Sequence, residues 1–355
     1  MKFRSRLIAF FSAAGMLILI LDSKTALYGA ATGIDLCIQT LVPSLFPFFV
    51  LSILLTGALS GQILTCLQPI CSVIGIPRGS ESLIAVSTLG GYPVGAQNVS
   101  LLHKQGQLST SEAVRLLAFC NNAGPSFIFG VVGTMFTDKK APWLLWLIHI
   151  FSAFLVGLLL PKTDSTDQTH FTTPQVRVTD AIIQAVRAMV QVCAWVICMR
   201  IILAFIDSWL LRFFPISVQV VVSGLLELSN GCIRLSHIES EGVRFLIASF
   251  LLSLGGLSVT LQTASVSEGI SMRMYFPGKI LQCCISMILS YIFQFLLSFQ
   301  SHCLRPSVLV LPIVIMITVL SFFHYSKKVV AFQNPLMYNQ LINMKEVSSC
   351  CFEKE

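Results

Sequence analysis

The residues best suited to bind a small molecule are amides that lie beside glycine and proline within apolar segments. In "LGGYPVGAQN", Gln97 and Asn98 lie one helical turn beyond Pro93, and Gln262 and Thr263 hold the equivalent place after "LGG" in the second half of the chain. An amide both donates and accepts hydrogen bonds, so facing pairs can hold a polar ring or a carboxylate without a net charge. Such groups also join helices inside membranes, but their position beside glycine and proline favours a binding site.

A second polar segment, "CNNAGPS", surrounds Gly124 and Pro125. Asn121, Asn122 and Ser126 lie here between two apolar arms, each shorter than the roughly 20 residues that cross a bilayer. The short arms predict a hairpin tip that lines a solute path rather than a turn outside the membrane.

An acidic residue, Glu227, lies in the otherwise apolar "SGLLELSNG", close to Ser229 and Asn230. Ionisable residues at membrane depth are functional candidates because their burial there is costly. Glu227 is a candidate to bind a coupling proton or sodium ion, or to orient the donors of a substrate. The alternative places it at the membrane interface, with a turn at 230–231.

Three arginines within apolar segments are candidates to counter an anionic solute, since the guanidinium fork suits carboxylates. Arg115 is the best of them because it precedes the asparagine pair by one and a half turns, whereas Arg187 is expected to snorkel to the interface. Arg200 is the third. His149 and His237 have no partner at ligand spacing and are interpreted as structural, so neither a metal site nor a cofactor is predicted.

The elements that position these residues are transmembrane helices. The 355-residue chain is 55% hydrophobic and only 11% charged, against about 25% in ordinary globular domains. Uncharged windows such as 36–77 and 245–267 are long enough to span a bilayer. The net charge of +7 comes from cations scattered singly at span ends, which indicates positive-inside anchoring rather than nucleic-acid binding.

Paired glycines at 90–91 and 255–256 stop helices, and Pro93 and Pro125 fit the first turn of a new helix. In hydrocarbon, each opened backbone group costs several kcal/mol unless protein or water satisfies it. Half-helix N-termini also present free N–H groups and a positive dipole end that suit a carboxylate. The sequence therefore predicts interrupted helices that meet around a wet cavity holding a small anion.

Two weakly similar halves are predicted. "LGGxxVxxQ" begins at Leu89 and again at Leu254, an offset of 165 (254 − 89), and "DxxxQ" begins at Asp35 and at Asp180, an offset of 145 (180 − 35). Interrupted segments at corresponding places in two halves point to the binding site of a transporter.

A single membrane domain is predicted over 1–330. Its first span, Leu7–Leu21, is interpreted as an uncleaved helix, and both termini are expected in the cytoplasm because "MKFRSR" and Lys327–Lys328 flank the outermost spans. The predicted parts are a first repeat at 7–160, a polar linker at 161–179, a second repeat at 180–300, a last span at 306–325 and a polar tail at 326–355. Within the first repeat, the second span is expected over Ile34–Leu59 and is interrupted by Pro43 and Pro47.

The motifs "GGYPVGAQNVSLL", "FCNNAGPSFIFGVVGTMF" and "GLLELSNG" resemble those of the sporulation integral membrane protein YlbJ (SpoVV) family, whose members carry a nucleoside-recognition, or Gate, domain. The resemblance extends from about Gly33 to Tyr291. It implies an inverted-repeat fold distantly similar to concentrative nucleoside transporters, and the family's proposed role of carrying dipicolinate across the outer forespore membrane. The second half departs from the pattern, because Ser258 stands where the first half has Pro93.

The predicted function is a carrier for a small anion, most directly dipicolinate. The alternatives are a nucleoside carrier and a non-transporting scaffold within a sporulation complex. An enzyme is not expected, because Asp35 and Asp180 lie at span starts and no Ser/His or His-Glu-x-x-His arrangement occurs. The expected partners are the solute and the lipid bilayer, and the sequence leaves homo-oligomerisation open.

The predicted solute-binding residues are Gly90, Gly91, Tyr92, Pro93, Gln97, Asn98, Arg115, Asn121, Asn122, Gly124, Pro125, Ser126, Glu227, Ser229, Asn230, Gly255, Gly256, Gln262 and Thr263.

Overall fold

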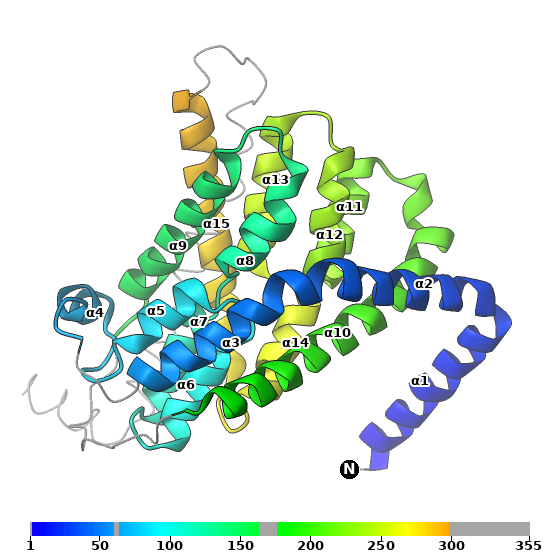
Figure 1. Cartoon of the computed structure of the whole chain (residues 1–355). Coiled ribbons are helices and arrows are strands. Elements are labelled where there is room, and N and C mark those ends of the chain that lie inside the picture. The colour runs from blue at the N-terminus through cyan, green and yellow to red at the C-terminus, as the bar shows by residue number, and fades with distance from the viewer. Residues whose placement is uncertain (1, 60–63, 163–175, 298–355) are drawn as a thin grey trace, which may run out of the picture.

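The computed structural model describes residues 2–59, 64–162 and 176–297, and all regular structure within these ranges is helical (Figure 1). The prediction of an all-α protein is therefore confirmed. Most of the predicted linker at 161–179, the last span at 306–325 and the tail at 326–355 lie outside the described residues.

The described ranges contain the helices α1 to α15. Up to the linker they are α1 (Lys2–Leu21), α2 (Ser23–Leu36), α3 (Val42–Leu59), α4 (Gln68–Ile74), α5 (Ser82–Leu89), α6 (Val94–Lys104), α7 (Thr110–Cys120), α8 (Pro125–Phe127) and α9 (Ala141–Leu159). Short turns at Ile128–Val132 and Gly133–Met135 extend α8. Beyond the linker they are α10 (Val178–Trp209), α11 (Ile216–Leu226), α12 (Leu228–Arg234), α13 (Glu241–Leu254), α14 (Gly256–Val266) and α15 (Tyr275–Leu297).

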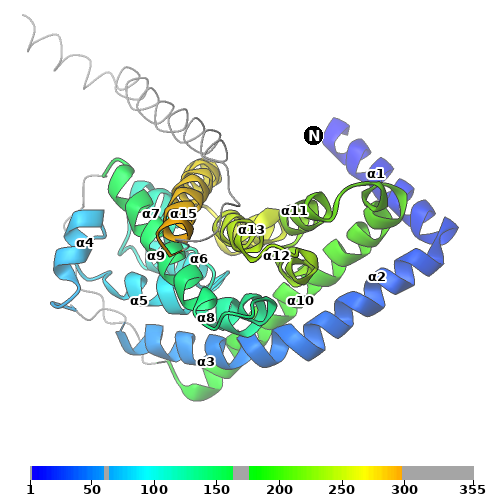
Figure 2. The same ribbon diagram turned by 90° about the horizontal axis from the view of Figure 1, so that it is seen from above.

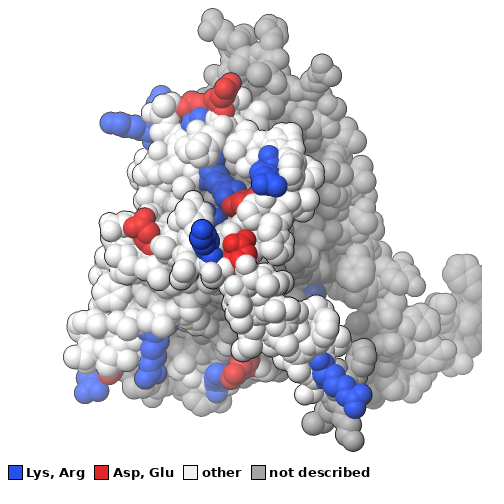
Figure 3. Space-filling model, turned by 90° about the vertical axis from the view of Figure 1, so that its right-hand side faces the viewer, with Lys and Arg blue, Asp and Glu red and all other residues white. Residues whose placement is uncertain are grey.

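Within the described ranges, six helical segments are long and apolar enough to cross a membrane. They are Ser23–Leu59, Thr110–Met135, Ala141–Leu159, Val178–Trp209, Glu241–Val266 and Met272–Gln294. Charged side chains occupy only small parts of the described surface on one face of the molecule (Figure 3), as a lipid-facing surface requires. The predicted polytopic membrane architecture is confirmed.

The second span begins earlier than predicted. Helix α1 ends with the expected first span, Leu7–Leu21, but helix resumes at Ser23 instead of Ile34. The side chain of Asp22 caps α2 by accepting a hydrogen bond of 3.2 Å from the Thr25 N–H. A carboxylate at an N-cap satisfies one of the free N–H groups there, so the new helix starts at once.

Two prolines expected to interrupt the second span do not do so. A π-helical turn at Cys37–Leu41 joins α2 to α3, and Pro43 and Pro47 follow within a continuous helix. A proline removes one backbone donor from the ladder, and the Ser44 hydroxyl adds a hydrogen bond in the same turn by donating to the Thr40 carbonyl at 2.6 Å. The widened turn and this side-chain bond accommodate the prolines.

The segment α2–α3 and helix α10 cross along one side of the molecule, and α5, α6, α8, α11 and α14 lie against them (Figures 1 and 2). The crossing is close because two glycines face α10. A Cβ on Gly29 would lie 2.8 Å from the Ile201 Cα, and one on Gly33 would lie 3.0 Å from the Ile197 Cα. Small residues four positions apart permit such an approach between membrane helices.

Four pairs of half-helices are the feature that positions the site. They are α5–α6, interrupted at 90–93; α7–α8, at 121–124; α11–α12, at Glu227; and α13–α14, at Gly255. The interruptions predicted at 90–93, 124–125 and 255–256 are present. The third pair, α11–α12, is interrupted at Glu227 because its side chain caps α12, so 230–231 is helix and not a turn.

The element order gives a different pairing of the two halves from the one predicted. After each long helix, α3 or α10, come two interrupted pairs and then one uninterrupted helix, α9 or α15, apart from the short α4. This order matches α5–α6 with α11–α12, and α7–α8 with α13–α14. The 165-residue offset instead joins α5–α6 to α13–α14, which hold different places in the order. The glycine pairs thus share a helix-stopping role without marking equivalent positions.

Replacing Gly33 by leucine is expected to separate α2 from α10. A side chain cannot fit beside the Ile197 backbone, and overpacking of this kind typically costs about 1–3 kcal/mol. Thermal unfolding of the purified protein in detergent measures the effect. Gly15→Leu is the matched control, since no atom lies within 4 Å of a Cβ there. Equal unfolding temperatures for the two variants would contradict the close crossing.

Candidate functional site

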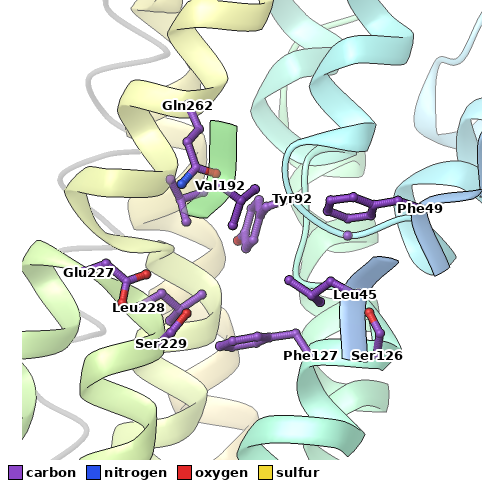
Figure 4. A pocket seen from close by; sticks show the side chains of 13 residues that line it. Leu45, Phe49, Tyr92, Ser126, Phe127, Val192, Glu227, Leu228, Ser229 and Gln262 are labelled. Atoms are coloured by element: carbon purple, nitrogen blue, oxygen red, sulfur yellow. The ribbon is translucent and has the colours of Figure 1, made fainter. Parts of the chain in front are cut away.

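The four interruptions converge on one small cavity, here called the central cavity, with a volume of about 40 Å³. Every interrupted pair contributes lining residues, and α3 and α10 close the remaining side. The lining residues are Leu45, Phe49, Gly91, Tyr92, Gly124, Ser126, Phe127, Val192, Glu227, Leu228, Ser229, Val259 and Gln262 (Figure 4). Residues far apart in the sequence thus meet at one place, as the interrupted pattern predicts.

The first two interruptions touch through their backbones. A Cβ on Gly91 would lie 3.1 Å from the Gly124 nitrogen, and Gly91 has a φ of +75° that side chains rarely adopt. One turn further, a Cβ on Gly95 would lie 2.0 Å from the Cys120 carbonyl oxygen. The Asn121 Oδ1 accepts from the Ala96 N–H at 3.3 Å, so an amide of the second interruption satisfies the backbone beside the first.

The other two interruptions pack in the same way. A Cβ on Gly256 would lie 2.5 Å from the Gly224 carbonyl oxygen, and Gly255 and Gly256 have φ values of +80° and +73°. The Tyr92 hydroxyl donates to the Leu252 carbonyl at 3.0 Å and so joins the two sets across the cavity. The predicted glycines therefore act through close backbone approach.

A buried network surrounds the second interruption. The Ala123 N–H donates to the His149 Nε2 at 3.0 Å, and the Asn122 amide donates to the Phe119 carbonyl at 2.7 Å. The Asn121 amide donates to the Thr263 hydroxyl at 2.8 Å. These bonds replace backbone partners that the opened helix has lost. They confirm the structural interpretation of His149.

Two residues of this network were missed by the sequence reasoning. Lys279 is 1% exposed, and its ammonium donates to the Asn121 carbonyl, to the Asn122 Oδ1 at 3.2 Å and to the Gln282 Oε1 at 2.9 Å. The Gln282 amide also donates to the Asn122 Oδ1 at 3.0 Å. Lys279 forms none of the ion pairs found among the described residues. One sequence feature could have indicated these two residues: a lysine and an amide three residues apart at the start of an apolar helix.

The acid of the site, Glu227, is 2% exposed and caps α12 from inside the cavity wall. Its Oε2 accepts from the Asn230 N–H at 2.8 Å and from the Asn230 amide at 3.0 Å. A negative charge is stabilised at a helix N-terminus by the free N–H groups and the dipole. Glu227, Ser229 and Asn230 thus lie together, and the first two line the cavity (Figure 4).

Two further polar side chains line the central cavity. The Gln262 amide is 3% exposed and donates to the Ser258 hydroxyl at 3.1 Å. The Ser126 hydroxyl is buried and has no hydrogen-bond partner within the described part of the chain. A buried hydroxyl without a partner costs about 1–3 kcal/mol, so it favours a polar occupant of the cavity.

The predicted amide pair in α6 faces a different space. Gln97 and Asn98 line a pocket of about 470 Å³ between α3, α6, α10 and α14, here called the interhelical pocket. The Asn98 amide also donates to the Val94 carbonyl of its own helix at 2.9 Å. Thr263 lies in the network around Asn121, and Pro93 and Pro125 begin the second half-helices.

The structure does not place Arg115 at either space, contrary to expectation. The guanidinium is fully used by the C-terminal carbonyls of α4 and α9 and of the residues after them. It donates to Ile74 at 2.7 Å, Gly75 at 3.0 Å, Gly157 at 2.6 Å and Pro161 at 2.8 Å. Arg115 therefore joins two helix ends, because a cation next to the asparagine pair in sequence need not face the same side.

Comparison with known proteins gives one curated relative. The chain is 24% identical, over an alignment of 328 residues, to the sporulation integral membrane protein YlbJ of Bacillus subtilis (strain 168), and the match covers 79% of this chain and 80% of the relative. No family model matches the chain, and no solved structure matches it.

Replacing Arg115 by lysine is expected to destabilise the protein although it retains the positive charge. An ammonium cannot reach four carbonyls around a planar fork, and each buried acceptor left without a donor costs about 1–3 kcal/mol. Thermal unfolding in detergent checks this against Arg273→Lys at an exposed position. A stable Arg115→Lys protein with weakened solute binding would instead restore Arg115 as a solute ligand.

Proposed function

Because the chain belongs to the YlbJ family of sporulation integral membrane proteins, we propose that it is a carrier for a small anionic solute, with dipicolinate as that solute, in the outer forespore membrane. The observation that carries the proposal is the convergence of four interrupted helix pairs on the central cavity. Opened backbone within a membrane is tolerated where it is buried in protein or lines a water-filled cavity. Secondary transporters place their solute and ion sites at such interruptions.

The polarity of the helix ends supports an anionic solute. The first turns of α8, α12 and α14 line the central cavity and carry positive dipole ends. The opposite, C-terminal ends of α7 and α13 are occupied, because Lys279 donates to the Asn121 carbonyl and Tyr92 to the Leu252 carbonyl. These ends favour negative charge: that of α12 meets the Glu227 carboxylate, and once a cation neutralises Glu227 the remaining ends favour an anion beside the cavity.

Glu227 supports coupling to a cation. An ionised carboxylate repels an anion by roughly 4 kcal/mol at 4 Å with an effective dielectric constant of 20. A proton or a sodium ion at Glu227 removes that repulsion. The volume of about 40 Å³ suits an ion or a water, since one water takes up about 30 Å³ of liquid. We therefore assign Glu227, with the Ser126 hydroxyl and the Gln262 amide, to the coupling ion.

The non-transporting scaffold and the enzyme are the competing classes. A scaffold has no use for polar groups around the cavity, so it would tolerate apolar residues at Ser126, Glu227 and Gln262. We propose a carrier rather than an enzyme because these groups form a lined space without a nucleophile–base pair. The nucleoside carrier and the anion carrier are distinguished by which of the two solutes the protein transports.

Uptake into proteoliposomes containing the purified protein tests the proposal. Labelled dipicolinate and labelled uridine are offered under proton and sodium gradients of either direction. We expect saturable dipicolinate uptake that one gradient accelerates. Uptake of uridine without dipicolinate would identify the protein as a nucleoside carrier. Uptake of neither compound would favour the scaffold.

Glu227→Gln is expected to uncouple transport from the ion gradient. The amide oxygen still accepts from the Asn230 N–H, so α12 keeps its cap, while the charge is lost. Gradient-driven accumulation should fall at least tenfold, whereas exchange of internal for external dipicolinate should persist. Glu268→Gln, at an exposed acid, is the control. Undiminished accumulation in Glu227→Gln would remove Glu227 from the coupling role.

A further inference from the structure

We propose that the interhelical pocket binds a small organic dicarboxylate, with Lys104 and Arg187 supplying its two cationic contacts. This inference rests on the proposed carrier function and names the place where its solute is held. The pocket is lined by both cations and by the amides of Gln97, Gln184 and Gln191. Among the described residues, no acidic side chain lines it.

The two cations are free to meet a ligand. Among the described residues, neither Lys104 nor Arg187 takes part in a side-chain hydrogen bond or an ion pair. By contrast, Arg115, Lys279 and Arg244 donate to backbone carbonyls. Arg187 was expected to snorkel to the interface; like Lys104 it is an exposed residue, and both line the open interhelical pocket.

Size decides which of the two spaces holds the solute. The interhelical pocket, at about 470 Å³, lies within the range of roughly 300–1,000 Å³ typical of small-molecule sites. The central cavity, at about 40 Å³, has room for little more than one water. An aromatic dicarboxylate therefore fits the pocket and not the cavity.

The pocket adjoins the central cavity along the same helices. Phe49 lines the cavity and Ile53 the pocket on α3, and Val192 and Ala188 do the same on α10. On α14 the pair is Gln262 and Val266. Each step is four residues, or about one helical turn. A solute in the pocket thus lies directly beside the cavity that contains Glu227.

The charges match a dicarboxylate better than a monocarboxylate or a neutral nucleoside. A guanidinium binds one carboxylate through two parallel hydrogen bonds, and an ammonium binds the second as a point charge. Amides on α6 and α10 can then donate to the remaining carboxylate oxygens or to a ring nitrogen. Two separated cations select for two separated anionic groups.

Equilibrium binding to the full-length protein in lipid nanodiscs tests the site. The probes are radiolabelled dipicolinate, isophthalate and benzoate, and the variants are Lys104→Gln, Arg187→Gln and the double variant. We expect the Kd for both dicarboxylates to rise about tenfold in each single variant, because charge-assisted hydrogen bonds contribute at about this level. The rise should be smaller for benzoate. Lys139→Gln and Arg273→Gln, at exposed cations away from the pocket, should bind like wild type.

The outcomes separate the site from the proposed function. If both substitutions leave dipicolinate binding and uptake unchanged in folded protein, the pocket site is overturned while the carrier stands. If dipicolinate is neither bound nor carried but isophthalate binds and depends on Lys104 and Arg187, the pocket site stands and the dipicolinate carrier fails. If the wild type binds no dicarboxylate, the pocket site is overturned. Thermal unfolding of each variant checks that a loss of binding is not a loss of fold.

Discussion

The constraint on which this structure depends is the need to satisfy backbone groups freed where helices open inside an apolar environment. Each such group left bare costs several kcal/mol. Side chains from other segments supply the missing partners: Asn121 for the Ala96 N–H, His149 for the Ala123 N–H, and Tyr92 for the Leu252 carbonyl. Every interruption thereby fixes the position of another element. The same bonds that make the open backbone tolerable also hold the interruptions together, so the central cavity is a consequence of how the breaks are stabilised.

This constraint also explains where the cations of the membrane domain lie. The two buried cations of the described residues, Arg115 and Lys279, do not pair with acids but donate to the C-terminal carbonyls of helices, where a positive charge meets the negative end of the dipole. Arg115 serves α4 and α9, Lys279 serves α7, and Arg244 donates to the Met135 carbonyl beyond α8 at 2.7 Å. Lys104 and Arg187 are exposed cations that line the interhelical pocket and, within the described part of the chain, donate to no helix end. A cation without a structural partner in such a place is the feature that a solute site needs.

The sequence predicted the parts of the site that depend on local chemistry. Glycine pairs and prolines predict interruptions because they act on the helix in which they lie. The motifs that resemble the YlbJ family are consistent with the relative, whose match covers most of the chain. The sequence did not predict which interruption contacts which, since those contacts are made by tertiary packing. Arg115 was predicted to lie in the site because it is close to Asn121 in the sequence. That proximity does not determine which face of α7 Arg115 occupies. Lys279 was not predicted, because a lysine at the start of an apolar helix has the same pattern as an interfacial anchor.

In the proposed carrier, the small central cavity holds the coupling cation and the larger interhelical pocket holds the anionic solute. A dicarboxylate in the interhelical pocket lies about one turn from the cavity that contains Glu227. At about 10 Å an ionised carboxylate still repels each carboxylate of the solute by roughly 1–2 kcal/mol with an effective dielectric constant of 20. Neutralising Glu227 with a proton or a sodium ion removes this cost, so occupation of the small cavity favours occupation of the large pocket. The coupling is reciprocal, because an anion in the pocket raises the affinity of the cavity for a cation by the same factor. In this arrangement the carrier needs no direct contact between ion and solute. The shared helices α3, α10 and α14 hold the two sites close enough for their charges to interact electrostatically.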